Sequence, residues 1–189
     1  MPRFNGAIMI VRNQQINING METLTTIDRL TDLRRPLTTD EVEFRVQSTK
    51  YKKATVLAYK TARTDTKILD ESGLIWQRKY DLIDGKLFCG IGIYFPEVSD
   101  FVWRWDTGTP SNMDADKGHA SDAFKRAGFA WGIGVELYDF PRITIPVKED
   151  TDKIYPASWT WAWKHNEEGK INNLAAKDRS GKIMFHHKG

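Results

Sequence analysis

The sequence predicts an α+β fold in which a curved antiparallel sheet packs on a long helix and is followed by a C-terminal β-meander. Short segments of alternating polar and apolar residues recur between Val42 and Asp106 and again after Pro146, which is typical of antiparallel strands. Between them, small and aromatic residues repeat at helical spacing up to Trp131, which predicts a helix with one face on the sheet. With 189 residues and 40% hydrophobic content, the chain is long enough for one such core.

We divide the chain into three regions and expect the elements of the core in the following order. The regions are an arm over 1–21, a core over 22–145 and a β-rich extension over 146–189. The expected core elements are a helix over 22–33, a β-hairpin over 42–59, a short helix over 61–71, strands over 74–82, 86–95 and 101–106, and a long helix over 114–131.

Helix spacing and turn residues justify the first half of this order. Leucine and isoleucine recur every three residues in the first helix, and Pro36 ends it. Val42, Phe44 and Val46 alternate with polar residues in the first arm of the hairpin, which predicts a half-buried strand. Gly73 is a suitable residue to follow the second helix.

A turn motif and a helix face of small residues support the second half of the expected order of elements. Asp84-Gly85 predicts a tight hairpin turn, and we expect the three strands around it to join the first hairpin in one curved sheet. Ser111, Asn112 and Asp114 are candidate caps of the long helix. One face of that helix is expected to pack closely on the sheet through Ala120, Ala123, Phe124, Ala127 and Trp131.

Length and composition also exclude several protein classes. No apolar run approaches the roughly 18 to 20 residues of a membrane helix, and Ala7–Val11 is too short for the core of a signal peptide. We therefore expect a cytoplasmic protein without a membrane partner, in the host cytoplasm if a phage encodes it. The single cysteine, Cys89, lies in an apolar segment, so we expect core packing rather than reactivity.

Nothing in the sequence favours catalysis, and we expect no enzyme activity and no cofactor. The histidines, His119, His165, His186 and His187, lack metal-ligand spacing with Cys89. Common nucleotide-binding and hydrolase motifs are absent, and the Gly-x-Gly segments at 90–92 and 132–134 are interpreted as structural. Asp114, Asp116 and Asp122 could hold a metal, but the first two also suit a helix N-terminus, where their charge complements the dipole.

The charge distribution is more informative than the net charge of +3. Residues 44–64 carry six cations and no acidic residue, with Phe44, Tyr51 and Tyr59 interleaved. Cations that meet phosphates and rings that stack on bases are typical of single-strand nucleic-acid binding. A solvated hairpin with a charged outer face is the alternative.

The extension after Pro146 is expected to form a meander of three short strands. Trp159, Trp161 and Trp163 alternate along the first of these strands, so all three lie on one of its faces. That face is either core or subunit interface, with base stacking as a further alternative.

The segment DKGHASDAFKRAGFAWGIG at 116–134 resembles the phage single-strand annealing proteins of the Rad-fifty-two-like superfamily, with S-D-x-F-K-R-A on a helix and W-G-I-G at its end. The resemblance extends upstream, in order, through FRVQS at 44–48, LAY at 57–59 with Arg63, WQ at 76–77 and DGKLFCGI at 84–91. It covers roughly residues 22–145. The order of these pieces argues against a chance match to the family, although no single piece would suffice.

The resemblance implies a β-β-β-α annealing core that forms homo-oligomeric rings or helical filaments and anneals complementary single strands of DNA without ATP, in recombination and repair. It implies a basic groove between hairpin and helix. A phage exonuclease or a host single-strand binding protein is a further candidate partner. The residues expected to bind DNA are Arg45, Lys50, Lys52, Lys53, Lys60, Arg63, Lys117, Lys125 and Arg126.

Two departures from the family pattern shift this expectation. Phe129 stands where some relatives carry a further arginine, and Val135 replaces the arginine common in the phage form. The basic surface is therefore expected to be thinner or displaced toward Lys50, Lys52 and Lys53. Two alternatives stay open: a protective single-strand binder that does not anneal, and a structural phage or plasmid component that oligomerises through its tryptophan strands.

Overall fold

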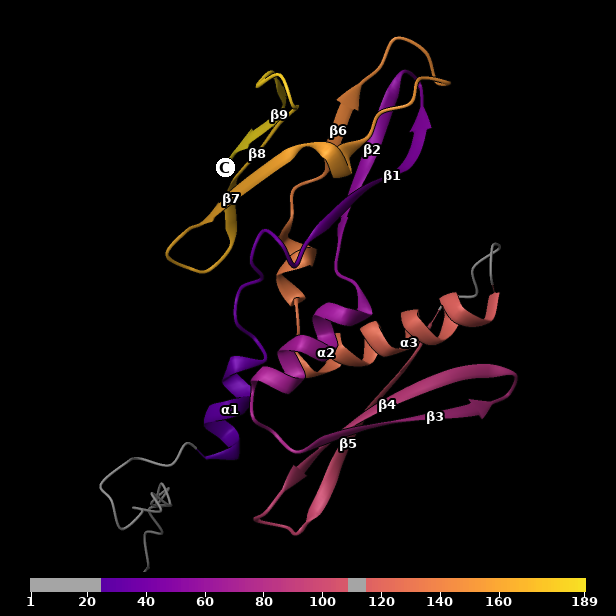
Figure 1. The fold of residues 1–189 in the computed structure, drawn as a ribbon, viewed down its shortest axis with the longest axis vertical. Coiled ribbons are helices and arrows are strands. Elements are labelled where there is room, and N and C mark those ends of the chain that lie inside the picture. Colours follow the sequence, from indigo (N-terminus) through magenta and orange to yellow (C-terminus); the bar gives the residue numbers. More distant parts are fainter. Residues whose placement is uncertain (1–24, 109–114) are drawn as a thin grey trace, which may run out of the picture.

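Three antiparallel sheets of three strands each, together with three α-helices, make up the computed structural model, which describes residues 25–108 and 115–189 (Figure 1). The strand orders are β1-β2-β6, β3-β4-β5 and β7-β8-β9. The α+β class is confirmed. The arm at 1–21 and the predicted caps Ser111, Asn112 and Asp114 lie outside the described residues.

The first helix is shorter than its apolar spacing predicts. α1 (Thr26–Asp32) begins after Thr25, whose hydroxyl accepts from the Asp28 N–H while the Asp28 carboxylate accepts from the Thr25 N–H. Leu33 is fully buried, but Ile27 is 70% exposed. The predicted apolar face is therefore only partly used for packing.

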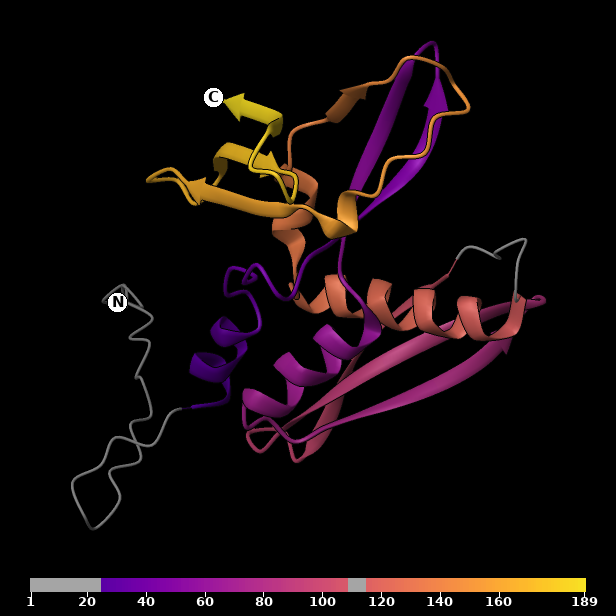
Figure 2. The same ribbon diagram turned by 45° about the horizontal axis from the view of Figure 1, so that its top comes forward.

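The first hairpin belongs to a sheet of its own, which corrects the expectation of one common sheet. β1 (Glu43–Lys50) and β2 (Lys53–Tyr59) pair as predicted, but the next neighbour of β2 is β6 (Ile143–Pro146). α2 (Ala62–Glu71) follows β2 directly and ends before Gly73, which has the left-handed φ of +66°. α2 packs against α3. The strand that follows α2, β3, starts on the far side of α3 from the hairpin (Figure 2).

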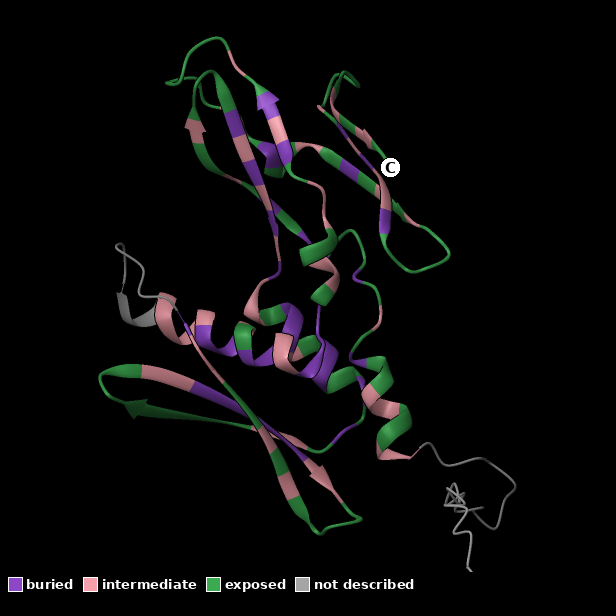
Figure 3. Cartoon of the chain, turned by 180° about the vertical axis from the view of Figure 1, so that it is seen from behind, coloured by how far each residue is buried: buried purple, intermediate pink, exposed green. Residues whose placement is uncertain are grey.

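The second sheet consists of the three strands predicted around Asp84-Gly85. They are β3 (Trp76–Ile83), β4 (Lys86–Phe95) and β5 (Asp100–Thr107). Asp84 and Gly85 both have positive φ, as the tight turn requires. β3 is exposed along most of its length (Figure 3). Cys89, Ile91 and Ile93 of β4 are fully buried.

α3 (Ala115–Trp131) covers one face of the second sheet through its contacts with β4 and β5 (Figure 2). The predicted packing face is confirmed for Ala123, Phe124, Ala127 and Trp131, which are all buried. The Trp131 indole N–H donates to the Ile91 carbonyl oxygen over 2.9 Å. This bond joins the end of the helix to the middle of the sheet.

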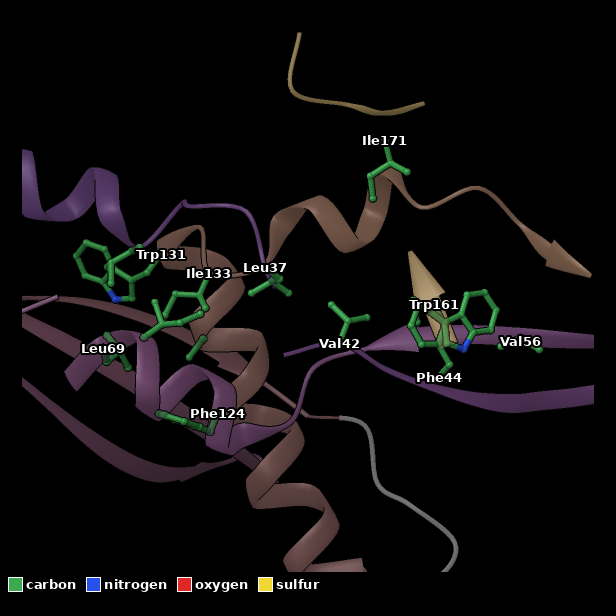
Figure 4. Packing of buried hydrophobic residues seen from close by; sticks show 14 of the residues in the cluster. Leu37, Val42, Phe44, Val56, Leu69, Phe124, Trp131, Ile133, Trp161 and Ile171 are labelled. Carbon is green, nitrogen blue, oxygen red and sulfur yellow. The ribbon is translucent and has the colours of Figure 1, made fainter. Parts of the chain in front are cut away.

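The C-terminal meander packs on the first hairpin of the same chain. After two 3-10 helices, η1 (Val135–Asp139) and η2 (Pro156–Ser158), it consists of β7 (Thr160–His165), β8 (Ile171–Lys177) and β9 (Ile183–Lys188). The rings of Phe44 and Trp161 stack with centroids 3.8 Å apart (Figure 4). Trp161 is buried and its neighbours Trp159 and Trp163 pack on the core, so the core interpretation of this face is confirmed.

Candidate nucleic-acid interface

The cations predicted to bind DNA fall into separate regions of the structure. Lys50, Lys52 and Lys53 lie at the tip of the first hairpin, and all three are exposed. Arg45 lies farther along β1, Arg63 lies on α2, and both are exposed as well. Lys60 is buried, Lys125 and Arg126 lie on α3, and the side chain of Lys117 lies outside the described residues.

The hairpin tip carries three lysines and one exposed ring within four consecutive residues. Tyr51 and Lys52 form the two-residue turn with φ of 55° and 56°, a conformation that strongly favours asparagine and glycine. The Tyr51 side chain is 89% exposed. Lys50 and Lys53 are directly paired across the hairpin beside the turn, so three exposed lysines and one exposed ring lie within four consecutive residues.

An acidic loop holds this strained turn in place. The Asp150 carboxylate accepts from the backbone N–H groups of Tyr51, over 3.1 Å, and of Lys52. These two bonds satisfy donors that the turn leaves free and offset part of the cost of its left-handed residues. Glu149 pairs with Lys52 over 3.1 Å, but both side chains are mostly exposed, so a phosphate can compete for that ammonium.

Farther from the tip, Arg45 and Arg63 keep accessible guanidinium groups. The Arg45 guanidinium carbon lies 5.1 Å from the centroid of the Tyr59 ring, a cation–π geometry that leaves the N–H edge free for a phosphate. The Tyr59 hydroxyl donates to Glu43 over 2.6 Å. Arg63 lies in the first turn of α2, after β2.

Lys60 does not belong to the candidate interface, contrary to the sequence-based expectation. Its side chain is 1% exposed and its ammonium is paired with the fully buried Asp65 of α2. The same nitrogen donates to the Lys125 carbonyl oxygen over 3.2 Å and lies 4.2 Å from the centroid of the Phe129 ring. Phe129 therefore contacts a cation of its own chain.

Burial sets the protonation of this pair. It raises the pKa of Asp65 to about 6 and lowers the pKa of Lys60, while the charge of each partner opposes the shift of the other. The second carboxylate oxygen of Asp65 accepts no hydrogen bond within the described residues. Gly128 of α3 gives the pair its space, because a Cβ there would clash with the bonded Asp65 oxygen.

The two cations on α3 are already paired with carboxylates. Lys125 lies 3.3 Å from Asp122, one turn away on the same helix, and Arg126 lies 3.2 Å from Asp106 of β5. Arg126 thus faces the second sheet, whereas the hairpin cations belong to the first. The structure does not bring the two sets into direct contact.

Metal-ligating and thiol side chains were the other candidates for chemistry among the described residues. They contain no group of three or more histidine, cysteine or acidic side chains placed to hold a metal ion. Burial raises the pKa of Cys89 to about 11, so its thiol stays protonated, as the core interpretation predicts. Among the helices described, none is long and apolar enough to span a membrane.

Sequence reasoning missed the acidic side of the hairpin tip. Glu149 and Asp150 lie about a hundred residues away in the chain from the lysines that they contact, and no local pattern links them. The only signal is their place shortly after Pro146, where β6 ends.

Comparison with protein-family models, curated proteins and solved structures finds no match to this chain.

Proposed function

We propose that this protein binds single-stranded DNA and anneals complementary strands without ATP, as a homo-oligomer in the cytoplasm. The observation that carries the proposal is the hairpin tip, which presents the exposed residues Lys50, Lys52 and Lys53 together with the exposed ring of Tyr51. Cations bind phosphates by releasing condensed counterions, and an exposed ring stacks on any base. Together they favour binding without sequence preference, which annealing of arbitrary strands requires.

The order of elements supports the same proposal. Three consecutive antiparallel strands, β3 to β5, are followed by α3, which lies on one face of their sheet. This order agrees with the β-β-β-α arrangement that the resemblance at 116–134 implies. The proposed interface consists of the tip lysines, Arg45 and Arg63, with Lys125 and Arg126 as a second set on α3.

Exposed apolar residues on an edge strand support self-association. Leu82 is 68% exposed and Ile83 is 48% exposed, both at the end of β3, and β3 has an unpaired edge within its sheet. Such an edge is a template for pairing with another chain. The proposed assembly is a ring or helical filament, with a phage exonuclease or a host single-strand binding protein as proposed further partners.

The proposal is tested by replacing the three tip lysines. Lys50→Gln/Lys52→Gln/Lys53→Gln should weaken binding of oligothymidine strongly at low salt and lower the log–log salt slope by about 2, since each phosphate contact contributes about 0.7. Fluorescence anisotropy at several salt concentrations measures both. The matched control is Lys164→Gln/Lys177→Gln/Lys182→Gln, which removes the same charge from exposed positions of the meander and should change little.

A strand-annealing assay with complementary oligonucleotides separates annealing from protection. Wild-type protein should accelerate duplex formation, and the tip variant should not. Binding without acceleration would support the non-annealing protective binder instead. Absence of binding at low salt would overturn the proposal altogether.

A further inference from the structure

On the second sheet, the face turned away from α3 carries a ladder of aromatic rings. Directly paired residues of an antiparallel sheet share a face, so Trp105 lies with Gly90, and Trp103 with Gly92. The alternate residues of β4, including Ile91, are buried against α3. The tryptophans and glycines therefore lie on the opposite side, which no described element covers in the view of Figure 2.

The two indoles lie flat on the glycines. A Cβ on Gly90 would lie 2.5 to 2.7 Å from three ring atoms of Trp105, and a Cβ on Gly92 would lie 2.8 to 2.9 Å from three ring atoms of Trp103. Both glycines are buried because the rings cover them. One broad face of each indole consequently rests on the strand. The Lys79 ammonium lies over the Trp103 ring, so the outward face of Trp105 is the more open of the two.

Further rings and a cation extend this surface. The indole centroids are 5.7 Å apart with planes at 28°, and Phe101 and then Tyr94 continue the row at 6.0 and 5.4 Å. The ammonium of Lys79, from β3 on the same face, lies 4.4 Å from the centroid of Trp103. Trp105 is 42% exposed.

We infer that this aromatic face, formed by Tyr94, Phe101, Trp103 and Trp105 with Lys79 beside it, binds single-stranded nucleic acid by stacking of its bases. The shape and the charge of the face identify its occupant. The flat outward face of Trp105, which is 42% exposed, offers the broad contact that a nucleobase makes. Lys79 and Lys86 on that face, against the single carboxylate of Asp81, favour an anionic partner over an apolar protein surface. This inference rests on the proposed function and adds where the bases bind.

The test compares two strands of equal length, oligothymidine and an abasic strand that keeps the phosphates. Wild-type protein should prefer oligothymidine. Trp105→Leu should reduce that preference about 10-fold, since one stacked base is worth about 5- to 150-fold, while leaving affinity for the abasic strand unchanged. Trp105→Phe keeps a flat ring and should keep most of the preference. Tyr155→Leu is the control, because this ring is 66% exposed and lies at the start of η2, outside the second sheet.

The remaining outcomes all contradict the inference, and they can be distinguished from one another. Unchanged preference in Trp105→Leu would exclude the aromatic face but leave the proposed function intact, and equal wild-type affinity for both strands would do the same. A smaller particle on sedimentation of Trp105→Leu would identify the face as an interface between copies. Failure of wild-type protein to bind either strand would overturn the proposed function as well.

Should Trp105→Leu not fold, Lys79→Gln decides the question. This exposed substitution removes the cation beside the rings and should weaken binding of oligothymidine severalfold with an unchanged melting temperature. Unchanged affinity in this variant would overturn the inference.

Discussion

Among single residues, Lys60 and Asp65 have the largest predicted effect on stability, because their buried ion pair joins α2 to α3. Removing one partner leaves an unpaired buried charge, so Lys60→Met should lower the free energy of unfolding by about 3–5 kcal/mol. Lys60→Met/Asp65→Leu should recover most of that loss, since an apolar pair of similar volume needs no desolvation of charge. Urea unfolding at neutral pH measures both; a double variant no more stable than the single one would contradict this.

Glu41 predicts a pH dependence of stability. Its buried carboxylate accepts hydrogen bonds from the two terminal nitrogens of the Arg35 guanidinium, each over 2.7 Å. It also accepts hydrogen bonds from the Lys67 ammonium and the Thr38 N–H, each over 3.0 Å. The hydrogen bonds from Arg35 hold the pKa of Glu41 well below its ordinary value of 4.5. A lowered folded-state pKa gives stability that is present above about pH 4.5 and lost as the pH falls.

The measurement compares wild-type protein with Glu41→Gln across this range. The variant should lose about 2 kcal/mol of unfolding free energy at pH 7, and the difference should shrink below about pH 4.5 because the wild-type carboxyl is then losing its advantage. Glu149→Gln, at an exposed position, is the control and should show a nearly constant, small difference. A pH-independent cost of Glu41→Gln would contradict the assignment.

At the level of elements, α3 provides a separate test of its two cations. Lys125→Ala/Arg126→Ala removes two partly exposed ion pairs, each worth at most about 1 kcal/mol, so the melting temperature should change little. If these cations contact DNA, binding and annealing should weaken together. Asp106→Asn frees Arg126 and should then strengthen binding. Unfolding of the double variant would instead assign the pair to the fold.

The elements themselves were predictable wherever a local pattern specifies them. The packing face of α3 follows from small residues at helical spacing, and the β3–β4 turn follows from Asp84-Gly85. The tip turn at Tyr51 and Lys52 lies within the predicted hairpin, but its left-handed conformation carries no sequence signal. Asp150 supplies the bonds that hold it, from a distant segment.

For the whole molecule, the proposed oligomer predicts a particle larger than the 21.8 kDa of one chain. If the exposed end of β3 forms the contact, Leu82→Glu/Ile83→Glu should shift sedimentation toward that mass, because charge on an edge strand opposes pairing. Val98→Glu, also at an exposed apolar position, is the control and should leave the particle unchanged. Wild-type protein that sediments at the mass of one chain at micromolar concentration, with and without DNA, would contradict the prediction.

By itself, the sequence determined the local elements of this protein, because strand alternation, helical spacing and turn residues act within a few positions of the chain. It also located the cationic hairpin, since Lys50, Lys52 and Lys53 are neighbours in the sequence. Only the tertiary structure decided that β2 pairs with β6 rather than joining the second sheet. It alone decided that Lys60 is buried against Asp65 and α3. Both outcomes depend on contacts between segments far apart in the chain, where packing and charge burial, rather than local preference, set the free energy.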